Sequence, residues 1–312
     1  MSALDGIGNT PLVELRRIVP PGAARLLLKL EWANPTGSMK DRMARAAIEA
    51  AEADGRLQPG GTVVEYTAGT TGISLAFVCA AKGYAIDIVF SDAFSEEKRR
   101  TMEAYGARLT IVPSESKQIN AALIQSMIRT AGELSQRPNH WYCDQLRNHD
   151  AIAGYLPMGE EIWQQSGGNV DAFVHAVGTA HSLHGVTRAL WAHGRVRIVA
   201  VEPAESAVLS GGAPGSHKIE GIGLGFTPPL WQPELVDEIQ PVSTEEAKAM
   251  ARRLAREEGI FAGISTGANV AAALRVAERH GGGKTVVTIA ADSGLRYLST
   301  DVFRATATDR GR

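Results

Sequence analysis

Strand-like and helix-like segments alternate along this chain from residue 62 onward, and this alternation constrains the fold more than any other feature. Residues 62–66, 85–90 and 108–112 read TVVEY, AIDIVF and RLTIV, and they are rich in the β-branched and apolar residues of buried strands. The stretches between them have helical composition, and each is followed by a glycine that can end a helix, at Gly83 and Gly106. Alternating strands and helices form a parallel sheet with right-handed crossovers, so the sequence predicts an α/β fold.

The alternation returns in the second half of the chain. It predicts strands at 171–177, 197–201 and 285–290, and helices at 183–191 and 243–258. Ligands of parallel sheets bind beyond the carboxyl ends of the strands. Two loops lie at such ends, residues 67–72 (TAGTTG) and residues 178–182 (GTAHS). Each precedes a predicted helix, and its hydroxyls and amides could hold a carboxylate or a phosphate at the helix N-terminus. A plain turn of small residues is the alternative for each.

Residues 34–42, NPTGSMKDR, hold a lysine in an unusual setting. A proline and a glycine predict a turn there, and Asp41 falls at the start of an alanine-rich helix. Lys40 therefore lies at a helix N-terminus, whose partial positive charge lowers the pKa of a nearby amine. An amine biased towards its neutral form can attack a carbonyl. The alternative is an ordinary surface lysine that precedes a helix.

This stretch resembles the cofactor-lysine motif of the cysteine synthase (O-acetylserine sulfhydrylase) and cystathionine β-synthase family, which are pyridoxal-phosphate enzymes of fold type II. Further segments resemble that family in the same order, from IGNTPL at 7–12, through KIEGIGLGF at 218–226, to DSGLRYLS at 292–299. The resemblance implies two domains, similar to those of tryptophan synthase β. Each is a mostly parallel twisted sheet with flanking helices, and the cofactor lies in the cleft between them.

The resemblance also implies how the chain is divided. A smaller, mobile domain at 36–146 closes on the substrate. A larger domain combines 1–35 with 147–305, and a polar tail follows at 306–312.

Pyridoxal 5′-phosphate is the cofactor that the resemblance implies, with Lys40 forming the Schiff base. The family has Gly-Thr-Gly-Gly-Thr at its phosphate-binding loop, which implies cofactor contacts from Gly178, Thr179, Ala180, His181 and Ser182. Ala180 and His181 replace glycines and tolerate positive φ poorly, so the loop either uses ordinary φ angles or is reshaped. His181 could add a donor to the phosphate.

Ser293 is implied to face the pyridine nitrogen of the cofactor. A neutral hydroxyl there leaves the ring less electron-withdrawing than a carboxylate would, and this favours β-elimination chemistry over transamination.

Residues 67–72 stand where the family has Thr-Ser-Gly-Asn-Thr-Gly, which grips the substrate carboxylate. Ala68 replaces the serine, and Thr70 replaces an asparagine that contacts the ring hydroxyl of the cofactor. Both departures remove polar reach from the pocket. The resemblance therefore assigns Thr70 to the cofactor, and it assigns to the substrate Thr67, Ala68, Gly69, Thr71, Gln145 and Gly221.

The implied reaction is β-replacement on an O-activated serine similar to O-acetylserine. Lys40 takes the Cα proton, the leaving group departs to give an aminoacrylate, and sulfide or another thiol adds at Cβ. The substrate or nucleophile could be altered in this chain. The alternatives are β-elimination of the ammonia-lyase or desulfhydrase type, addition of a non-sulfur nucleophile in a biosynthetic pathway, and a paralogue that binds the cofactor without turnover.

Composition narrows the partners. The formal net charge is −2 and no basic block appears, so nucleic acid is not expected. The chain opens without a signal peptide and has no apolar run of membrane-spanning length, which predicts a cytoplasmic protein with reduced thiols at Cys79 and Cys143. His181 and His184 could face one way, but no third ligand has a recognisable spacing, so no metal is predicted. The resemblance implies a homodimer.

Overall fold

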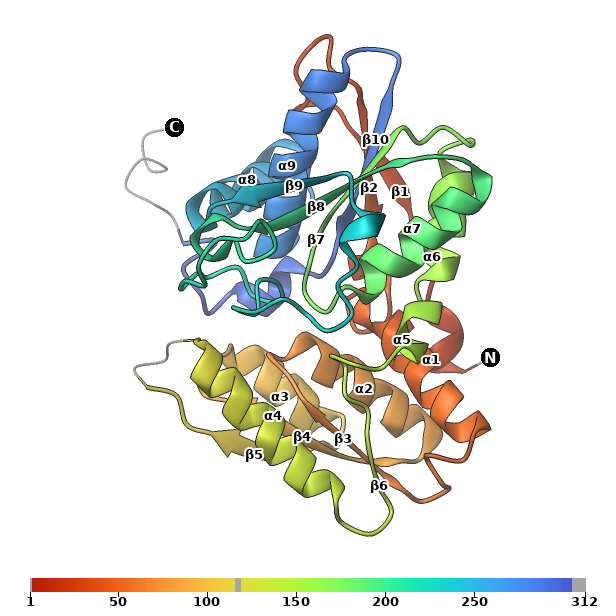
Figure 1. Cartoon of the computed structure of the whole chain (residues 1–312), viewed down its shortest axis with the longest axis vertical. Helices are drawn as coiled ribbons and strands as arrows, with labels where there is room; N and C mark the ends of the chain where they lie inside the picture. The colour runs from red at the N-terminus through yellow and green to blue at the C-terminus, as the bar shows by residue number, and fades with distance from the viewer. Residues whose placement is uncertain (1, 116–118, 305–312) are drawn as a thin grey trace.

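The computed structural model describes residues 2–115 and 119–304 as two lobes, each built on one sheet with flanking helices (Figure 1). The predicted α/β fold is confirmed. The predicted tail at 306–312 lies outside the described residues. None of the helices within the described ranges is both long and apolar enough to cross a lipid bilayer.

The smaller sheet has four parallel strands in the order β5-β4-β3-β6. They are β3 (Thr62–Tyr66), β4 (Ala85–Ser91), β5 (Arg108–Val112) and β6 (His140–Tyr142). Strand β3 is buried along its whole length, as its TVVEY sequence predicts for a central strand. The helices of this part of the chain are α1 (Lys40–Ala53), α2 (Thr70–Lys82), α3 (Glu96–Ala104) and α4 (Ala121–Ser135).

The larger sheet has six strands in the order β1-β2-β10-β7-β8-β9. They are β1 (Leu12–Leu15), β2 (Arg25–Leu30), β7 (Ala172–Ala176), β8 (Arg197–Pro203), β9 (Glu238–Val242) and β10 (Thr285–Ala290). Only the β1–β2 pair is antiparallel among these strands. The N-terminal strand β2 pairs with the C-terminal strand β10, so strands from both ends of the described chain share one sheet.

Helices α5 (Asp150–Ala153), α6 (Leu156–Gln165), α7 (His181–His193), α8 (Thr244–Glu257) and α9 (Ile264–His280) complete the larger lobe. Short 3-10 helices are found at η1 (Ala3–Gly6), η2 (Glu31–Ala33), η3 (Ala204–Ser206), η4 (Pro233–Leu235) and η5 (Gly294–Tyr297). Ser243 caps α8 by accepting a hydrogen bond from the Glu246 amide, in agreement with the predicted helix start.

Two predicted loops are shorter than expected. Helix α2 begins at Thr70 and α7 begins at His181, so the predicted loops at 67–72 and 178–182 each lose residues to the following helix. In both cases one residue with positive φ immediately precedes the helix, Gly69 at 124° and Ala180 at 72°. A single left-handed residue reverses the chain direction sharply, and the helix can then start at the next position.

A buried ion cluster fixes the start of α1 against the larger lobe. Arg42, in the first turn of α1, pairs with Glu31 at 2.8 Å and with Glu161 at 2.7 Å. Lys29 of β2 also pairs with Glu161 at 2.7 Å. Movement of α1 away from the larger lobe would separate Arg42 from its partners and leave buried charges uncompensated, which is costly. The cluster therefore holds the first turn of α1, and hence Lys40, in a defined place.

Candidate functional site

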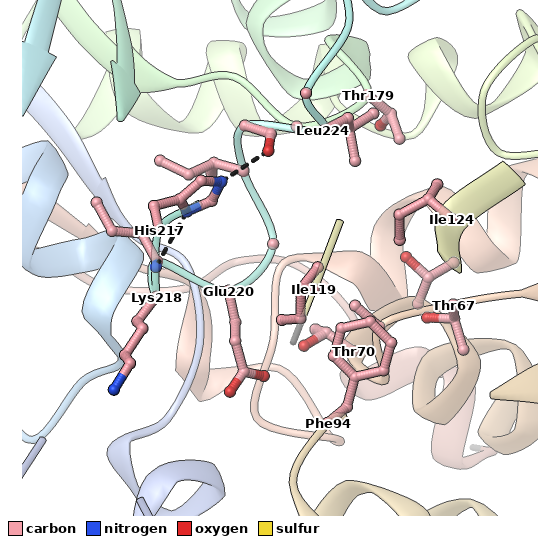
Figure 2. A pocket seen from close by; sticks show the side chains of 18 of the residues that line it. Thr67, Thr70, Phe94, Ile119, Ile124, Thr179, His217, Lys218, Glu220 and Leu224 are labelled. Atoms are coloured by element: carbon pink, nitrogen blue, oxygen red, sulfur yellow. Dashed lines mark hydrogen bonds between the residues drawn. The ribbon is translucent and has the colours of Figure 1, made fainter. Parts of the chain in front are cut away.

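A cavity of about 390 Å³ is lined by side chains from both lobes (Figure 2). The smaller lobe contributes Thr67, Thr70 and Phe94, and the facing wall is a loop of residues 214–225. A second cavity of about 40 Å³ shares lining residues with the first, among them Lys40, Thr70, Gly178 and Thr179. Lys40 thus lies where the two cavities meet.

Lys40 is the first residue of α1, and the turn before it is held in the larger lobe. The Met39 amide donates to the Ala291 carbonyl at 2.9 Å, and Ser38 forms an isolated bridge with Asp292. Burial lowers the pKa of Lys40 to about 8, and the nearby Asp292 carboxylate opposes this shift. The predicted direction of the pKa shift is confirmed, and its main cause is burial.

The turn at residues 67–72 is held together by the side chain of its first residue. The Thr67 hydroxyl accepts hydrogen bonds from the amides of Gly69 at 2.9 Å and Gly72 at 3.3 Å. A Cβ atom added to Gly69 would lie 2.4 Å from Cδ of Lys98. Gly69 is therefore required both for its positive φ and for the close approach of Lys98.

Thr71 and Gln145 meet on the wall of the larger cavity. The Thr71 hydroxyl donates to Oε1 of Gln145 at 2.8 Å, and Nε2 of Gln145 donates to the Tyr66 carbonyl at 2.8 Å. Thr67, Ala68 and Thr70 also line this cavity, whereas Gly69 is not on its wall.

The turn at residues 178–182 lies at the carboxyl end of β7. Gly178 and Thr179 line both cavities, and Ser182 lines the smaller one. The φ angle of Ala180 is 72°, so the turn keeps a left-handed residue although an alanine occupies the position. The expectation that the loop would avoid positive φ or be reshaped is therefore wrong at this residue.

His181 does not point a free ring nitrogen into either cavity. Its Nδ1 contacts the Thr179 hydroxyl at 2.8 Å and its Nε2 contacts the Asn148 carbonyl at 2.9 Å. The expectation that His181 adds a direct donor to the site is therefore wrong, because both ring nitrogens are already engaged.

Comparison with known proteins decides the family. Residues 3–292 match the family model described as pyridoxal-phosphate dependent enzyme. The chain is 45% identical to a cysteine synthase of Staphylococcus aureus over 300 residues, and this alignment covers 95% of each protein.

The chain belongs to the family of pyridoxal-phosphate dependent enzymes.

Solved structures agree with this assignment. The cysteine synthase of Entamoeba histolytica matches with a TM-score of 0.90 at 37% identity, over 99% of this chain and 93% of that chain. The O-acetylserine dependent cystathionine beta-synthase of Helicobacter pylori matches with a TM-score of 0.91 at 34% identity, over 97% and 98% of the two chains. The fold is therefore fold type II, and the cofactor of this enzyme is pyridoxal 5′-phosphate.

The residues around the two cavities fit such a cofactor. Within the described ranges, the amides of Thr179, Ala180 and His181 donate to no backbone carbonyl, so they remain available to an anion. A Cβ atom on Gly178 would lie 2.4 Å from the Gly221 carbonyl oxygen, so only glycine lets these two loops approach each other. The amine of Lys40 reaches the same cavities and can condense with an aldehyde.

Ser293 lies beside these cavities and not on their walls. Its hydroxyl accepts a hydrogen bond from the Leu295 amide at 3.3 Å, and its amide donates to the Gly37 carbonyl at 3.0 Å. The preceding residue, Asp292, does line the smaller cavity, and it accepts a hydrogen bond from the Tyr297 hydroxyl at 2.8 Å. Sequence reasoning did not assign a role to Asp292.

Two further wall residues escaped the sequence analysis. Lys98 of α3 pairs with Glu220 of the facing loop, and its ammonium lies 4.7 Å from the centre of the Tyr297 ring. Figure 2 shows Glu220 and Thr70 directed towards the same space. Lys98 sits in the charged sequence EEKRR, which resembles any exposed helix, so nothing in the sequence indicated that it is buried.

Glu65 was also missed. It lies in the middle of β3 and is fully buried, which raises the pKa of its carboxyl well above the ordinary value. Its two oxygens accept hydrogen bonds from the amides of Tyr66 and Gln145, both at 3.0 Å. Glu65 therefore fixes the backbone at Gln145, and a single acidic residue within an apolar strand was the only clue in the sequence.

Proposed function

We propose that this protein is a cysteine synthase-type enzyme that replaces the β-substituent of O-acetylserine, or of a similar O-activated serine, with sulfide or another thiol. The observation that carries the proposal is the position of Lys40, a buried amine with a pKa of about 8 at the junction of two cavities. The names of the relatives support the substrate: they are a cysteine synthase and an O-acetylserine dependent cystathionine beta-synthase.

Lys40 has two roles in this proposal. It holds the cofactor through its amine, and once the substrate has displaced it, the free amine removes the proton from Cα of the substrate. A lysine with a lowered pKa has a substantial neutral fraction near neutral pH, and this is the form that accepts a proton. Bound pyridoxal phosphate supplies the electron sink that makes the Cα proton acidic.

The 67–72 turn binds the α-carboxylate of the substrate. Its hydroxyls and amides lie at the N-terminus of α2, where a negative charge is favoured. The Thr71–Gln145 hydrogen bond orients two polar groups on the cavity wall before the substrate arrives. The residues assigned to the substrate are Thr67, Ala68, Gly69, Thr71, Gln145 and Gly221.

In this proposal the 178–182 turn would hold the cofactor phosphate, and Lys40 would hold the aldehyde carbon. Thr70 would contact the ring hydroxyl, and Ser293 would serve the pyridine nitrogen. The residues assigned to the phosphate are Gly178, Thr179, Ala180, His181 and Ser182, of which His181 acts through Thr179.

The remaining parts of the proposal concern the whole molecule. Residues 36–146 form a smaller, mobile domain that closes the larger cavity, while 1–35 and 147–305 form the larger domain. The protein acts in the cytoplasm as a homodimer.

A second candidate differs only in the nucleophile, which would be larger than sulfide. The larger cavity supports it, because its wall includes the apolar side chains of Phe94, Ile119, Ile124 and Leu224 (Figure 2). A small anion such as sulfide needs no apolar wall, whereas an organic thiol would bury its carbon chain there.

The direct test is chemical. The purified protein should be yellow, and reduction with borohydride should fix the cofactor on the peptide that contains Lys40. An unmodified Lys40 peptide from a yellow, reduced sample would contradict the assignment.

Turnover separates the candidate reactions. Product analysis with O-acetylserine should show cysteine when sulfide is present, and a thioether when an organic thiol replaces it. Pyruvate and ammonia formed at the same rate with and without thiol would instead indicate β-elimination.

A further inference from the structure

Buried histidines lie behind both hydroxyl groups of the 178–182 turn. The Thr179 hydroxyl is 2.8 Å from Nδ1 of His181, and the Ser182 hydroxyl is 2.7 Å from Nε2 of His175. The two histidines are 0% and 1% exposed, respectively. The protonation of each imidazole therefore decides whether the hydroxyl beside it donates to the ring or to a ligand.

The surroundings of His175 fix its neutral form. Two hydrogen bonds fix the orientation of the Asn269 side-chain amide. Its Oδ1 accepts from the Ala176 amide at 2.7 Å, and its Nδ2 donates to the Ile289 carbonyl at 2.8 Å. This Nδ2 donor also lies 3.4 Å from Nδ1 of His175. Nδ1 is therefore the unprotonated nitrogen, and Nε2 donates to Ser182. The proton of the Ser182 hydroxyl is left free for a phosphate oxygen.

The surroundings of His181 give the opposite result. Its Nε2 is 2.9 Å from the Asn148 carbonyl oxygen, and a carbonyl can only accept, so Nε2 carries the proton. Nδ1 of the neutral ring is then unprotonated, and it accepts a hydrogen bond from the Thr179 hydroxyl. Thr179 consequently presents only lone pairs to the cavity, which is unfavourable for a phosphate oxygen.

The charges that face His181 keep it neutral when no phosphate is bound. Burial and, after it, the charge of Lys40 in α1 lower its pKa to about 3; His184 of α7 and His149, which precedes α5, act in the same direction. The Asn148 carbonyl opposes them. A phosphate dianion beside Thr179 brings the negative charge that favours an imidazolium.

We propose that His181 takes up one proton from solvent when the cofactor phosphate binds, and that Thr179 reverses its hydrogen bond as a result. Nδ1 of the imidazolium then donates to the Thr179 hydroxyl, and this hydroxyl turns its own proton towards a phosphate oxygen. No covalent bond forms or breaks. His181 is thus a positioning residue for the cofactor, and it takes a place where the family resemblance predicts a glycine.

This inference rests on the proposed phosphate site, and it predicts a linkage between pH and cofactor binding. A group that gains a proton on binding favours binding at low pH. Affinity is lost as pH rises, by up to about tenfold for each pH unit, until the pKa of the bound imidazolium is passed. The dissociation constant of pyridoxal phosphate should therefore rise with pH, from neutral pH up to the pKa of the imidazolium in the holoenzyme.

Two variants isolate the effect of His181. His181→Asn places a non-titrating amide near the Nδ1 position, while His184→Asn changes a buried histidine one turn further along α7. Neither ring nitrogen of His184 has a hydrogen-bond partner in the described part of the chain, so this variant is the matched control. The Schiff base of Lys40 forms in all three proteins, so each of them shows some pH dependence, and the comparison is between their slopes. We expect the affinity of wild type and of His184→Asn for pyridoxal phosphate to fall in parallel as pH rises. The affinity of His181→Asn should fall less steeply, by up to about tenfold less per pH unit.

Parallel slopes in all three proteins would overturn the inference while leaving the phosphate site intact. A wild-type protein that binds no cofactor would overturn both. Should His181→Asn fail to fold, nitrogen NMR of histidine-labelled wild-type holoenzyme gives the answer independently. Two protonated ring nitrogens on His181 at pH 7 support the inference, and one bare nitrogen contradicts it.

Discussion

The turns at 67–72 and 178–182 are built alike, yet their surroundings give them different properties. Each follows the carboxyl end of a parallel strand, each has one residue with positive φ, and each leads directly into a helix. In the first turn the hydroxyl of Thr67 is used to hold the turn itself. In the second, the hydroxyls of Thr179 and Ser182 are bonded to buried imidazoles. Turns of similar local geometry are thus held by a hydroxyl of the turn in one case and bonded to buried imidazoles in the other.

The residue with positive φ differs between the turns for a reason that the structure makes clear. Gly69 has Lys98 against its α-carbon, so no side chain fits there. Ala180 is buried, and its methyl group is accommodated despite the left-handed backbone. The first turn therefore requires glycine both for space and for its φ angle. The second turn tolerates alanine in both respects.

The largest predicted effect comes from Gly69→Ala. The new methyl group would combine a left-handed backbone, costing about 1–2 kcal/mol, with an overlap that costs roughly another 1–3 kcal/mol. We expect a lower denaturant midpoint and loss of substrate binding. Gly83→Ala is the control, because Gly83 also has positive φ, at 79°, but nothing lies within 4 Å of the added atom. Equal destabilisation by both changes would show that the contact with Lys98 is unimportant.

Removal of one hydroxyl from each turn should separate their functions. Thr71→Val leaves Oε1 of Gln145 without its donor, at a cost of about 1–3 kcal/mol, and should raise KM for the amino-acid substrate. Thr179→Val should instead weaken retention of pyridoxal phosphate by a similar free energy. The measurements are KM with saturating cofactor and the cofactor dissociation constant. If each variant altered both quantities equally, the assignment of one turn to substrate and the other to cofactor would fail.

The double change Ala68→Ser with Thr70→Asn tests whether the first turn marks a different substrate. It restores polar groups that the resemblance predicts, and one such hydrogen bond is worth about 0.5–1.5 kcal/mol, or roughly a few-fold to tenfold in specificity. We expect a higher kcat/KM for O-acetylserine with sulfide and a lower one with a bulky thiol. Unchanged values for both pairs would remove the reason to expect an altered substrate.

The smallest predicted effect is that of Ala180→Gly. Relief of the left-handed alanine gains about 1–2 kcal/mol, but loss of the buried methyl group and the greater freedom of unfolded glycine cost about as much. The free energy of unfolding should therefore change by less than about 1 kcal/mol. Ala189→Gly is the matched control, since Ala189 is buried in the interior of α7. It should cost about 1–2 kcal/mol, because no strain is relieved there. Equal losses in both variants would mean that Ala180 is not strained.

The sequence by itself determined the α/β fold and the bounds of its most regular elements. The strands at 62–66, 108–112 and 285–290 have the predicted bounds, because their β-branched runs and flanking turn residues act locally. The motif resemblance singled out Lys40, Thr71 and Gln145, and the structure places all three on one cavity, although Thr71 and Gln145 are 74 residues apart. The two helix starts were placed too late, because short polar residues suit both a loop and the first turn of a helix.

Tertiary structure alone decided which ordinary residues complete the site. Lys98 and Glu220 are 122 residues apart, and Lys98 is buried where it meets Glu220, the Tyr297 ring and the backbone of Gly69. Glu65 fixes Gln145 across 80 residues, and His181 meets the carbonyl of Asn148 across 33. Burial shifts the pKa of Glu65 and of His181, and a long-range hydrogen bond sets which ring nitrogen of His181 carries the proton. Neither can be read from the residues beside them in the sequence.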